Sequence, residues 1–408
     1  MVTGLSRKSS KAISPVLIVY LSWGKSLSVP LRQQFDVALY MIKQKLRGNK
    51  RYPLVLMLEP LFRCNLSCPG CGKVDYPDEI LNLRLSVDEC VNAALECGAP
   101  IVSIPGGEPL LHREIGEIVK RLIEKKKYVT LCTNAQILEK KIHLFSPSPY
   151  FNFSIHLDGD REDHDRSVSL EGAYDRAESA IKLALSKGFR VTINCTLYNT
   201  AVPKRTAAFF DHMMALGLDD ITVSPGYAYE RAADQQHFLN REATKNMFRE
   251  LFRIGKEGVL AGKPKWRFSQ SALFMDFLAG NQTYSCTPWG IPSYSVFGWQ
   301  RPCYLIGEGY AKTYRELMDS TDWDKYGSGR YEKCANCMVH CGYEPTAAED
   351  AFSHPLKALK VALCGIKTNG PMARELDFTK QRPAENVFSR HVEDTLARIH
   401  ATKKGENS

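Results

Sequence analysis

Three cysteines, Cys64, Cys68 and Cys71, are spaced C-x3-C-x2-C in the segment FRCNLSCPGCGK. Three thiolates in so short a loop can bind three irons of a [4Fe–4S] cluster and leave the fourth iron without a protein ligand. Such an open position is typical of a catalytic metal site, because a structural site fills every position with protein ligands. A zinc knuckle would need a fourth ligand, and the loop supplies none. The spacing therefore favours a catalytic iron–sulfur cluster.

A glycine-rich turn, Gly106-Gly107-Glu108-Pro109, follows the next expected strand. Paired glycines let the backbone approach a ligand closely, and a glutamate can accept a hydrogen bond from an ammonium group. The turn alone would be a weak signal. Because it comes one strand–helix unit after the cysteine loop, it strengthens the prediction of a cluster site.

The segments that position these motifs alternate between strand and helix patterns from about residue 52 to residue 224. Strands are expected at 52–59, 101–104, 128–133, 150–157, 190–197 and 220–224, and helices at 86–97, 115–126, 174–187 and 203–216. Six successive units of this kind predict a parallel sheet with right-handed crossovers.

Polar side chains on one face of three expected strands favour a barrel or partial barrel over a doubly wound sheet. They are Thr130, Cys132 and Asn134 on the third strand, Asn152, Ser154, His156 and Asp158 on the fourth, and Thr192, Asn194 and Thr196 on the fifth. A parallel strand covered by helices on both faces should be apolar on both. The polar faces therefore predict a lumen that is wet or holds a ligand.

Composition places the chain among globular proteins with a sizeable core. It has 408 residues, of which 44% are hydrophobic and 24% charged, and a net charge of +9. These values exclude disorder of the whole chain and carry no nucleic-acid signature. An odd number of cysteines, 13, argues against a secreted disulfide framework and favours metal or thiol chemistry in a reducing compartment.

We expect four regions along the chain. They are an N-terminal extension over residues 1–29, a leading amphipathic helix over 30–51, a core barrel over 52–263 and a cysteine-rich C-terminal domain over 264–408. Within the extension, the apolar run Ile13–Trp23 is shorter than the roughly 20 residues that span a membrane. We expect this extension to be disordered, with a weak lipid anchor as the alternative.

The leading helix is expected to begin after Ser28 and to end at Gly48. Phe35, Leu39 and Leu46 recur at helical spacing and mark one apolar face, together with Ile42.

The two motifs and the strand–helix alternation resemble the radical S-adenosylmethionine (SAM) superfamily, whose fold is a partial (β/α)6 barrel. The resemblance implies that the three cysteines bind a [4Fe–4S] cluster whose open iron chelates SAM. It implies that the SAM amino group is held by Gly106, Gly107 and Glu108, and its ribose by Ser154 and Asp158. One electron, from a donor of the flavodoxin or ferredoxin type, would then cleave SAM to methionine and a 5′-deoxyadenosyl radical.

The chain departs from the superfamily pattern at Gly70, where an aromatic residue that touches adenine often precedes the last cysteine. Adenine packing must then come from another part of the chain.

A second group of cysteines lies in the C-terminal region, at Cys286, Cys303, Cys334, Cys337 and Cys341. The pattern resembles the start of the SPASM/twitch extensions of radical SAM enzymes, which bind auxiliary iron–sulfur clusters. It departs from the usual spacing, and five cysteines exceed four ligands. The alternatives are a structural zinc site and reduced cysteines packed as small hydrophobic residues.

Longer stretches resemble the radical SAM enzymes of hopanoid biosynthesis; among them are YPLVLMLEPLFRCNLSCPGCGK, SIPGGEPLLH, FSIHLDGDREDHDRSV and YEKCANCMVHCGYE. The likeness runs from about Val29 to His391. It implies that the 5′-deoxyadenosyl radical adds to the terminal alkene of diploptene, a pentacyclic C30 hydrocarbon, and that SAM is a consumed co-substrate. It also implies a bacterial cytoplasmic protein that makes peripheral contact with the inner face of the membrane.

Addition to such an alkene leaves a tertiary carbon radical, which needs a hydrogen atom to become product. A thiol S–H is the weakest such bond among protein side chains, and Cys132 lies near the end of the third strand on its lumen face. Cys132 is therefore a candidate hydrogen-atom donor, with buried packing as the alternative. His156 is a candidate for a hydrogen bond to the nucleoside or for a structural role.

A lipid substrate calls for a membrane-facing surface. Basic residues recur every four positions at Arg241, Lys245, Arg249 and Arg253, beside an apolar set of Phe238, Met247, Phe248, Leu251 and Phe252. A basic stripe next to an apolar one is typical of an interfacial helix, and the lysines and arginines of residues 43–51 would add to it. The alternative is a helix packed on the core with a solvated basic face.

Two other function classes remain open. A radical SAM peptide maturase of the SPASM/twitch type would fit the C-terminal cysteines, but it would call for a peptide-binding module, and no separate module of that kind is evident. A non-catalytic iron–sulfur protein would be better served by a closed four-cysteine site.

Overall fold

The computed structural model describes residues 29–228, 232, 234, 236–385 and 388–405. The predicted N-terminal extension, with its apolar run Ile13–Trp23, lies outside the described residues except for Val29.

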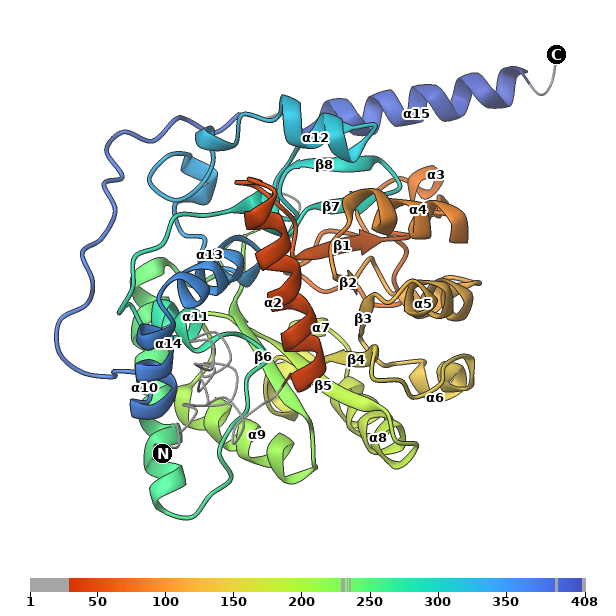
Figure 1. Cartoon of the computed structure of the whole chain (residues 1–408). Coiled ribbons are helices and arrows are strands. Elements are labelled where there is room, and N and C mark those ends of the chain that lie inside the picture. The colour runs from red at the N-terminus through yellow and green to blue at the C-terminus, as the bar shows by residue number, and fades with distance from the viewer. Residues whose placement is uncertain (1–28, 229–231, 233, 235, 386–387, 406–408) are drawn as a thin grey trace, which may run out of the picture.

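A nine-stranded sheet with the order β6-β5-β4-β3-β2-β1-β7-β8-β9 forms the centre of the molecule (Figure 1). Its first six strands are parallel neighbours in chain order. They are β1 Val55–Glu59, β2 Ile101–Ile104, β3 Tyr128–Thr133, β4 Phe151–His156, β5 Arg190–Leu197 and β6 Asp220–Pro225. This confirms the predicted partial (β/α)6 barrel, which is not closed.

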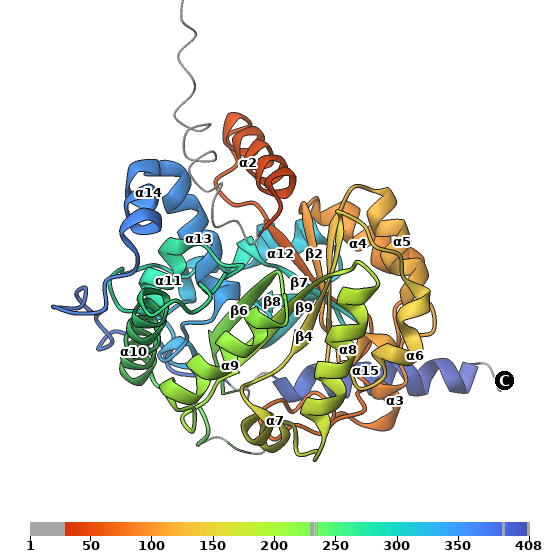
Figure 2. The same ribbon diagram turned by 90° about the horizontal axis from the view of Figure 1, so that it is seen from below.

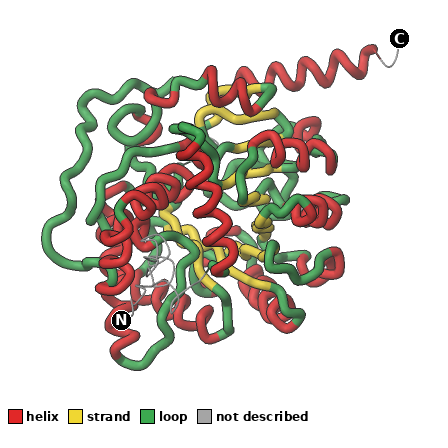
Figure 3. The backbone as a smooth tube through the Cα atoms, in the orientation of Figure 1, coloured by secondary structure: helices red, strands yellow, loops and turns green. Residues whose placement is uncertain are grey.

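Helices between these strands cover the outer face of the curved sheet (Figures 1 and 3). They are α4 Val87–Cys97, α5 Ile115–Glu124, α6 Leu138–Lys141, α8 Ala173–Ser186 and α9 Pro203–Ala215. The capping box that begins α4 is present, because Ser86 Oγ accepts from Glu89 N at 3.2 Å and Glu89 Oε2 accepts from Ser86 N at 2.7 Å. Short helices α3 Asp78–Leu81 and α7 Arg161–Val168 lie in loops at the carboxyl ends of the strands.

The C-terminal region extends the same sheet and does not form a separate layer. β7 Ser293–Ser295 pairs in parallel with β1, and β8 Gly298–Pro302 and β9 Gly307–Ala311 continue as an antiparallel pair. At the other edge, Ile221 N of β6 donates to Arg267 O at 2.8 Å. The boundary predicted at residue 264 is therefore not a break in the structure. β7, β8 and β9 join the sheet by pairing with one another and with β1, and the sequence pattern does not show such pairing.

A group of C-terminal helices packs beside β6 and α9, at the left of Figure 1. It comprises α10 Arg241–Leu260, α11 Ala272–Leu278, α13 His340–Ser353 and α14 Pro355–Cys364. The remaining helices are α12 Tyr314–Ser320 and α15 Phe388–Gly405, with 3-10 turns at Pro109–Leu111, Ile142–Leu144, Pro288–Gly290, Trp323–Lys325 and Glu332–Cys334.

The basic residues of α10 do not form the predicted interfacial stripe. Arg241 and Lys245 are buried and pair with Glu375, while Arg249 donates to backbone carbonyls and Arg253 pairs with Glu250 and Glu257. The apolar residues beside them, Met247, Phe248, Leu251 and Phe252, are buried in the core. The alternative interpretation, a core-packed helix, is correct for α10. No helix in the described part of the chain has the length and apolar character needed to cross a bilayer.

The leading helix α2, Leu31–Leu46, has its predicted bounds but presents the opposite face to the core. Gln34, Ala38 and Met41 are its buried residues. The apolar face marked by Phe35 and Leu46 is exposed. Helical periodicity shows that a face is apolar, but not which surface covers it.

Candidate active site

A cavity of about 1110 Å³ occupies the interior of the partial barrel. Its lining includes the predicted polar residues Thr130, Cys132, Asn134, Asn152, Ser154, His156, Thr192, Asn194 and Thr196. Several of them bond one another: Thr130 Oγ1 donates to Asn152 Oδ1 at 2.9 Å, and Asn152 Nδ2 donates to Thr192 Oγ1 at 3.4 Å. The lumen predicted from the polar strand faces is confirmed. Some of the polar groups on its wall form hydrogen bonds with one another.

The cysteine loop follows β1 and places Cys64, Cys68 and Cys71 on the cavity wall as free thiols. Burial raises the pKa of all three, that of Cys64 to about 11. Buried thiols of this kind stay protonated unless a cation stabilises the thiolate, as a bound metal does. Leu66 N and Asn134 Nδ2 already point at Cys64 Sγ, at 3.4 and 3.7 Å.

These three thiols fit a cluster better than a single ion. In the described part of the chain, no three His, Cys, Asp or Glu side chains converge as ligands of one metal ion do. A [4Fe–4S] cluster binds each cysteine through a different iron, so its ligands need not converge on one point. The geometry therefore gives no support to zinc at this loop.

The glycine-rich turn packs directly against the segment that leads into the cysteine loop. Gly107 N donates to Leu61 O at 3.0 Å, and Glu108 N donates to Arg63 O at 2.9 Å. A Cβ on Gly107 would overlap the carbonyl oxygens of Phe62 and Arg63. Gly106 has φ +64°, where glycine is favoured. Both glycines line the cavity, so the turn joins the cysteine loop to the remainder of the site.

The side chain of Glu108 is fully buried and is not among the residues that line the cavity, and its predicted contact with the SAM amino group stays a prediction. Its carboxylate accepts from Leu110 N at 2.9 Å, Thr133 Oγ1 at 2.8 Å and Asn134 N at 2.8 Å. These bonds tie the turn to the end of β3. The side chain therefore braces the site.

Glu108 should make stability depend on pH. Burial raises its pKa to about 7 from 4.5, so its contribution to stability is full below pH 4.5 and is lost as the pH rises through 7. Relative to Glu108→Gln, the free energy of unfolding of the wild type should fall by about 3 kcal/mol across this window. Urea unfolding of the cluster-free protein at a series of pH values measures this difference. A difference that does not change with pH would show that Glu108 does not titrate there.

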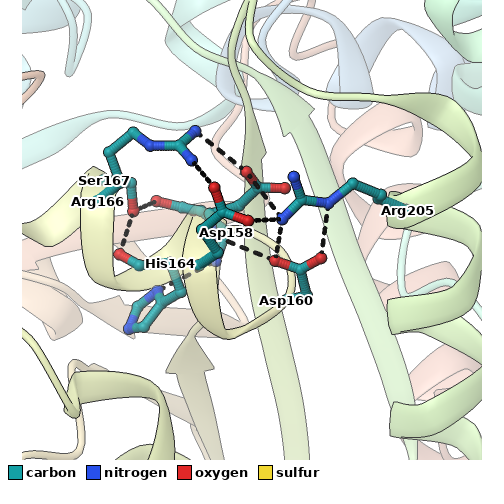
Figure 4. Close-up of polar contacts among 8 residues, drawn as sticks. Asp158, Asp160, His164, Arg166, Ser167 and Arg205 are labelled. Carbon is teal, nitrogen blue, oxygen red and sulfur yellow. Dashed lines mark hydrogen bonds and ion pairs between the residues drawn. The ribbon is translucent and has the colours of Figure 1, made fainter.

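Asp158 is buried and is not among the residues that line the cavity, and its predicted contact with the SAM ribose stays a prediction. Its Oδ1 accepts from Thr196 N and from His156 Nε2, both at 2.8 Å, and its Oδ2 accepts from Ser167 Oγ at 2.8 Å. Figure 4 shows this carboxylate at the start of α7, close to the ion pairs between Asp160 and Arg205 that join α7 to α9. Asp158 therefore holds His156, Ser167 and the backbone of Thr196 in place through these hydrogen bonds.

His156 lines the cavity and is the group that Asp158 holds. Burial alone would lower its pKa, but the Asp158 carboxylate and its hydrogen bond outweigh burial and raise it. Ser154, the other predicted ribose contact, remains on the cavity wall beside Cys132. Strand alternation placed both residues on the inner face of β4, whereas Asp158 lies in the loop that follows this strand.

Tyr198 is a site residue that sequence reasoning missed. It follows β5, lines the cavity, and occupies the space beside Gly70, where a Cβ would lie 3.3 Å from the tyrosine hydroxyl. Its ring packs on His237, with centroids 4.5 Å apart, and on Phe238 at 5.8 Å. An aromatic side chain is thus present where Gly70 lacks one. No motif links these two positions, because they lie far apart in the sequence.

The five C-terminal cysteines come together as buried or half-buried thiols next to the cavity. Burial, followed by the charges of the other four, raises the pKa of Cys286. Backbone amides bond three of the sulfurs: Leu305 and Ile306 at Cys303, Gly327 at Cys334, and Val339 at Cys337. Hydrogen bonds to sulfur are a feature of iron–sulfur sites. The residues present fit a second cluster, and Cys341 also lines the main cavity.

The part of the chain that carries the cysteine loop and the glycine turn is similar to known proteins. Residues 58–213 match the model of the radical SAM superfamily, and residues 221–361 match a domain of unknown function, DUF3463. GTP 3′,8-cyclase of Clostridium perfringens is 30% identical over 141 residues, which are 33% of this chain and 44% of the cyclase. PqqA peptide cyclase of Granulibacter bethesdensis is 25% identical over 152 residues, 36% of this chain and 40% of the relative. The matches thus span less than half of these curated relatives.

Solved structures show the same fold over a larger share of the chain. SuiB of Streptococcus suis superposes with a TM-score of 0.57 and 16% identity, covering 80% of this chain and 81% of SuiB. A second structure, anSMEcpe with bound AdoMet and a peptide, gives a TM-score of 0.54 and 19% identity, covering 77% of this chain and all of that one. Residues 58–213 of the chain thus match the radical SAM superfamily, whose cofactors are the [4Fe–4S] cluster and SAM predicted from the sequence.

Proposed function

We propose that this enzyme adds the 5′-deoxyadenosyl radical to the terminal alkene of diploptene, which would make it an adenosylhopane synthase. The observation that carries the proposal, beside the sequence resemblance, is the apolar part of the cavity. Its apolar wall comprises Val37, Met41, Leu54, Phe252, Trp266, Phe268, Ile291, Val361 and Ile366. A pentacyclic hydrocarbon offers no polar group, so only an apolar wall can bind it.

The size of the cavity supports two ligands. At about 1110 Å³ it exceeds the roughly 300–1,000 Å³ usual for one drug-sized ligand. SAM would take the end lined by the cysteines and the glycine turn, which leaves the apolar part for a second bulky molecule.

The residues on the cavity wall can be given roles in this reaction. Cys64, Cys68 and Cys71 would hold the cluster, and together the cluster and SAM supply the 5′-deoxyadenosyl radical when bound. The backbone of Gly106 and Gly107 would receive the amino group of SAM. Ser154, Tyr198 and His156 would contact the nucleoside, with Tyr198 taking the place of the aromatic residue that Gly70 lacks.

Cys132 remains the proposed hydrogen-atom donor. It lines the cavity, and its Sγ lies 3.3 Å from Ser103 Oγ. Burial raises the pKa of Cys132, which keeps it in the S–H form that donation requires. The thiol gives one hydrogen atom to the tertiary carbon radical and becomes a thiyl radical. One electron from the donor protein and one proton then restore the thiol.

Cys132→Ala should separate SAM cleavage from product formation. We expect 5′-deoxyadenosine still to form, while the saturated adduct falls at least about tenfold or appears as a mixture of stereoisomers, because hydrogen delivery loses its fixed direction. Product analysis by mass spectrometry and NMR measures both. Cys195→Ala is the matched control, since Cys195 is a fully buried strand cysteine outside the cavity wall. Adduct at the wild-type rate and purity from Cys132→Ala would contradict the role.

A second candidate function is peptide modification of the SPASM/twitch type. The curated relatives include a peptide cyclase, and SuiB has been solved bound to its precursor peptide. An anaerobic assay with SAM, a strong reductant and diploptene distinguishes the two. A product with the mass of diploptene plus deoxyadenosyl supports the lipid reaction. Abundant 5′-deoxyadenosine without an adduct would overturn it and leave the peptide alternative.

We also propose that the C-terminal cysteines hold an auxiliary iron–sulfur cluster, on the strength of their grouping and their N–H···S bonds. Reduction would come from a flavodoxin- or ferredoxin-type donor. The lipid substrate would place the enzyme in the bacterial cytoplasm, in peripheral contact with the inner face of the membrane.

A further inference from the structure

The cavity opens at the end of the barrel opposite the cysteine loop. Helix α2 lies across the amino ends of β3 and β4, where Asp36 accepts from Tyr128 Oη at 2.6 Å and Arg32 donates to Tyr150 Oη at 2.7 Å. The cysteine loop instead follows the carboxyl end of β1. A six-residue strand spans roughly 20 Å, so the cavity reaches from one end of the barrel toward the other.

Three exposed apolar side chains mark this opening because they also line the cavity. They are Val259 and Leu260 at the end of α10 and Leu363 at the end of α14; Leu260 is 81% exposed and Leu363 is 71% exposed. Further exposed apolar residues, Leu31, Phe35, Leu39 and Leu46 on α2 and Leu356 on α14, extend the apolar surface beyond the opening. We call these eight residues the apolar rim. Figure 2 shows α2 and α14 standing on the same side of the sheet.

Basic residues on these three helices, or in the few residues after α2 and α10, accompany the rim. Lys43, Arg47, Lys50, Lys256, Lys265 and Lys360 are exposed, and none of them has a carboxylate within 4.0 Å in the described part of the chain. Two acidic residues of these helices are already bonded, Asp36 to Tyr128 and Glu257 to Arg253. The surface therefore combines exposed leucines and a phenylalanine with an excess of positive charge.

We infer that the apolar rim docks the protein onto an anionic lipid bilayer, so that the cavity opens directly into the acyl region. Apolar side chains beside lysines and arginines are what binding at an anionic interface requires. The inference rests on the proposed function, because docking would let a hydrocarbon substrate enter the cavity from the bilayer without crossing water. The docking surface is thus α2, α14 and the end of α10, and not the basic stripe predicted along α10.

Flotation of the full-length reconstituted protein with vesicles tests the docking. The variant carries Phe35→Gln, Leu46→Gln and Leu356→Gln, three rim residues that are 55%, 84% and 80% exposed and lie outside the cavity wall. The matched control carries Leu95→Gln, Leu144→Gln and Leu170→Gln, exposed leucines on other parts of the barrel. On phosphatidylcholine vesicles containing phosphatidylglycerol, we expect the rim variant to partition at least about tenfold more weakly than the wild type. The control should float like the wild type, and added salt should weaken binding.

Several results would overturn the inference. They are no flotation of the wild type, equal flotation of the rim variant, a wild-type dimer that the rim variant disrupts, or loss of flotation after removal of residues 1–28, which would mean that this segment and not the rim binds the lipid. Detergent-dispersed diploptene separates docking from chemistry, because the rim variant should then form adduct at the wild-type rate. If the wild type forms no adduct in any format, the proposed substrate fails, while flotation still reports on docking.

Discussion

Replacing Cys68 with alanine is expected to abolish SAM cleavage. The three loop cysteines each hold a different iron, so the loss of one should remove the [4Fe–4S] cluster and with it about four irons per chain. Iron and sulfide analysis, the visible absorption spectrum and the yield of 5′-deoxyadenosine measure the effect under anaerobic conditions. Cys68 is half-buried and packs against the apolar cluster of Leu66, Val168 and Ala173, and burial raises the pKa of its thiol.

The control for this prediction is Cys90→Ala, because Cys90 is fully buried in α4 and packs as a small apolar side chain. It should keep its iron and its activity. A Cys68→Ala protein with full iron content and SAM cleavage would show that the loop cysteines are not the cluster ligands. Iron that survives in Cys68→Ala but is lost in a variant of Cys303, Cys334 and Cys337 would instead report the auxiliary cluster.

Gly107→Ala is expected to have the second largest effect. The added Cβ would overlap two backbone carbonyls, Phe62 O and Arg63 O, and lie 2.6 Å from Arg63 C. Backbone cannot rotate aside as a side chain can, so the turn must separate from the segment that leads into Cys64. Overpacking usually costs about 1–3 kcal/mol, and here the upper end is expected. SAM binding and cluster retention should fall together.

Gly258→Ala is the matched control, since Gly258 lies in helix α10 and its Cβ would meet only the flexible side chain of Lys263 at 3.3 Å. Alanine favours a helix by up to about 1 kcal/mol over glycine, so this variant should be unchanged or slightly more stable. Urea unfolding and SAM-binding titrations compare the two. Wild-type SAM affinity in Gly107→Ala would mean that the turn can shift without disturbing the site.

Much of the fold could be predicted because its signals are local. The capping box of Ser86 and Glu89 begins α4 as expected, and the alternation of Thr130 and Cys132 with apolar residues placed both on the lumen face of β3. The short strands β7, β8 and β9 could not be predicted, because their partners decide that they join the sheet. The same holds for α2, whose apolar face is exposed although its bounds were predicted correctly.

The sequence by itself determined which residues can act together when they lie on one loop or one strand. The spacing of Cys64, Cys68 and Cys71, and the alternation along β4, restrict where those side chains can point, whatever the remainder of the chain does. Only the tertiary structure decided the outcomes that depend on distant segments. It turned Glu108 and Asp158 into braces behind the site, brought Tyr198 beside Gly70, and left the cavity open at an apolar rim. The physical reason is that a carboxylate or an apolar face is satisfied by whichever partner packs against it, and those partners come from elements far apart in the sequence.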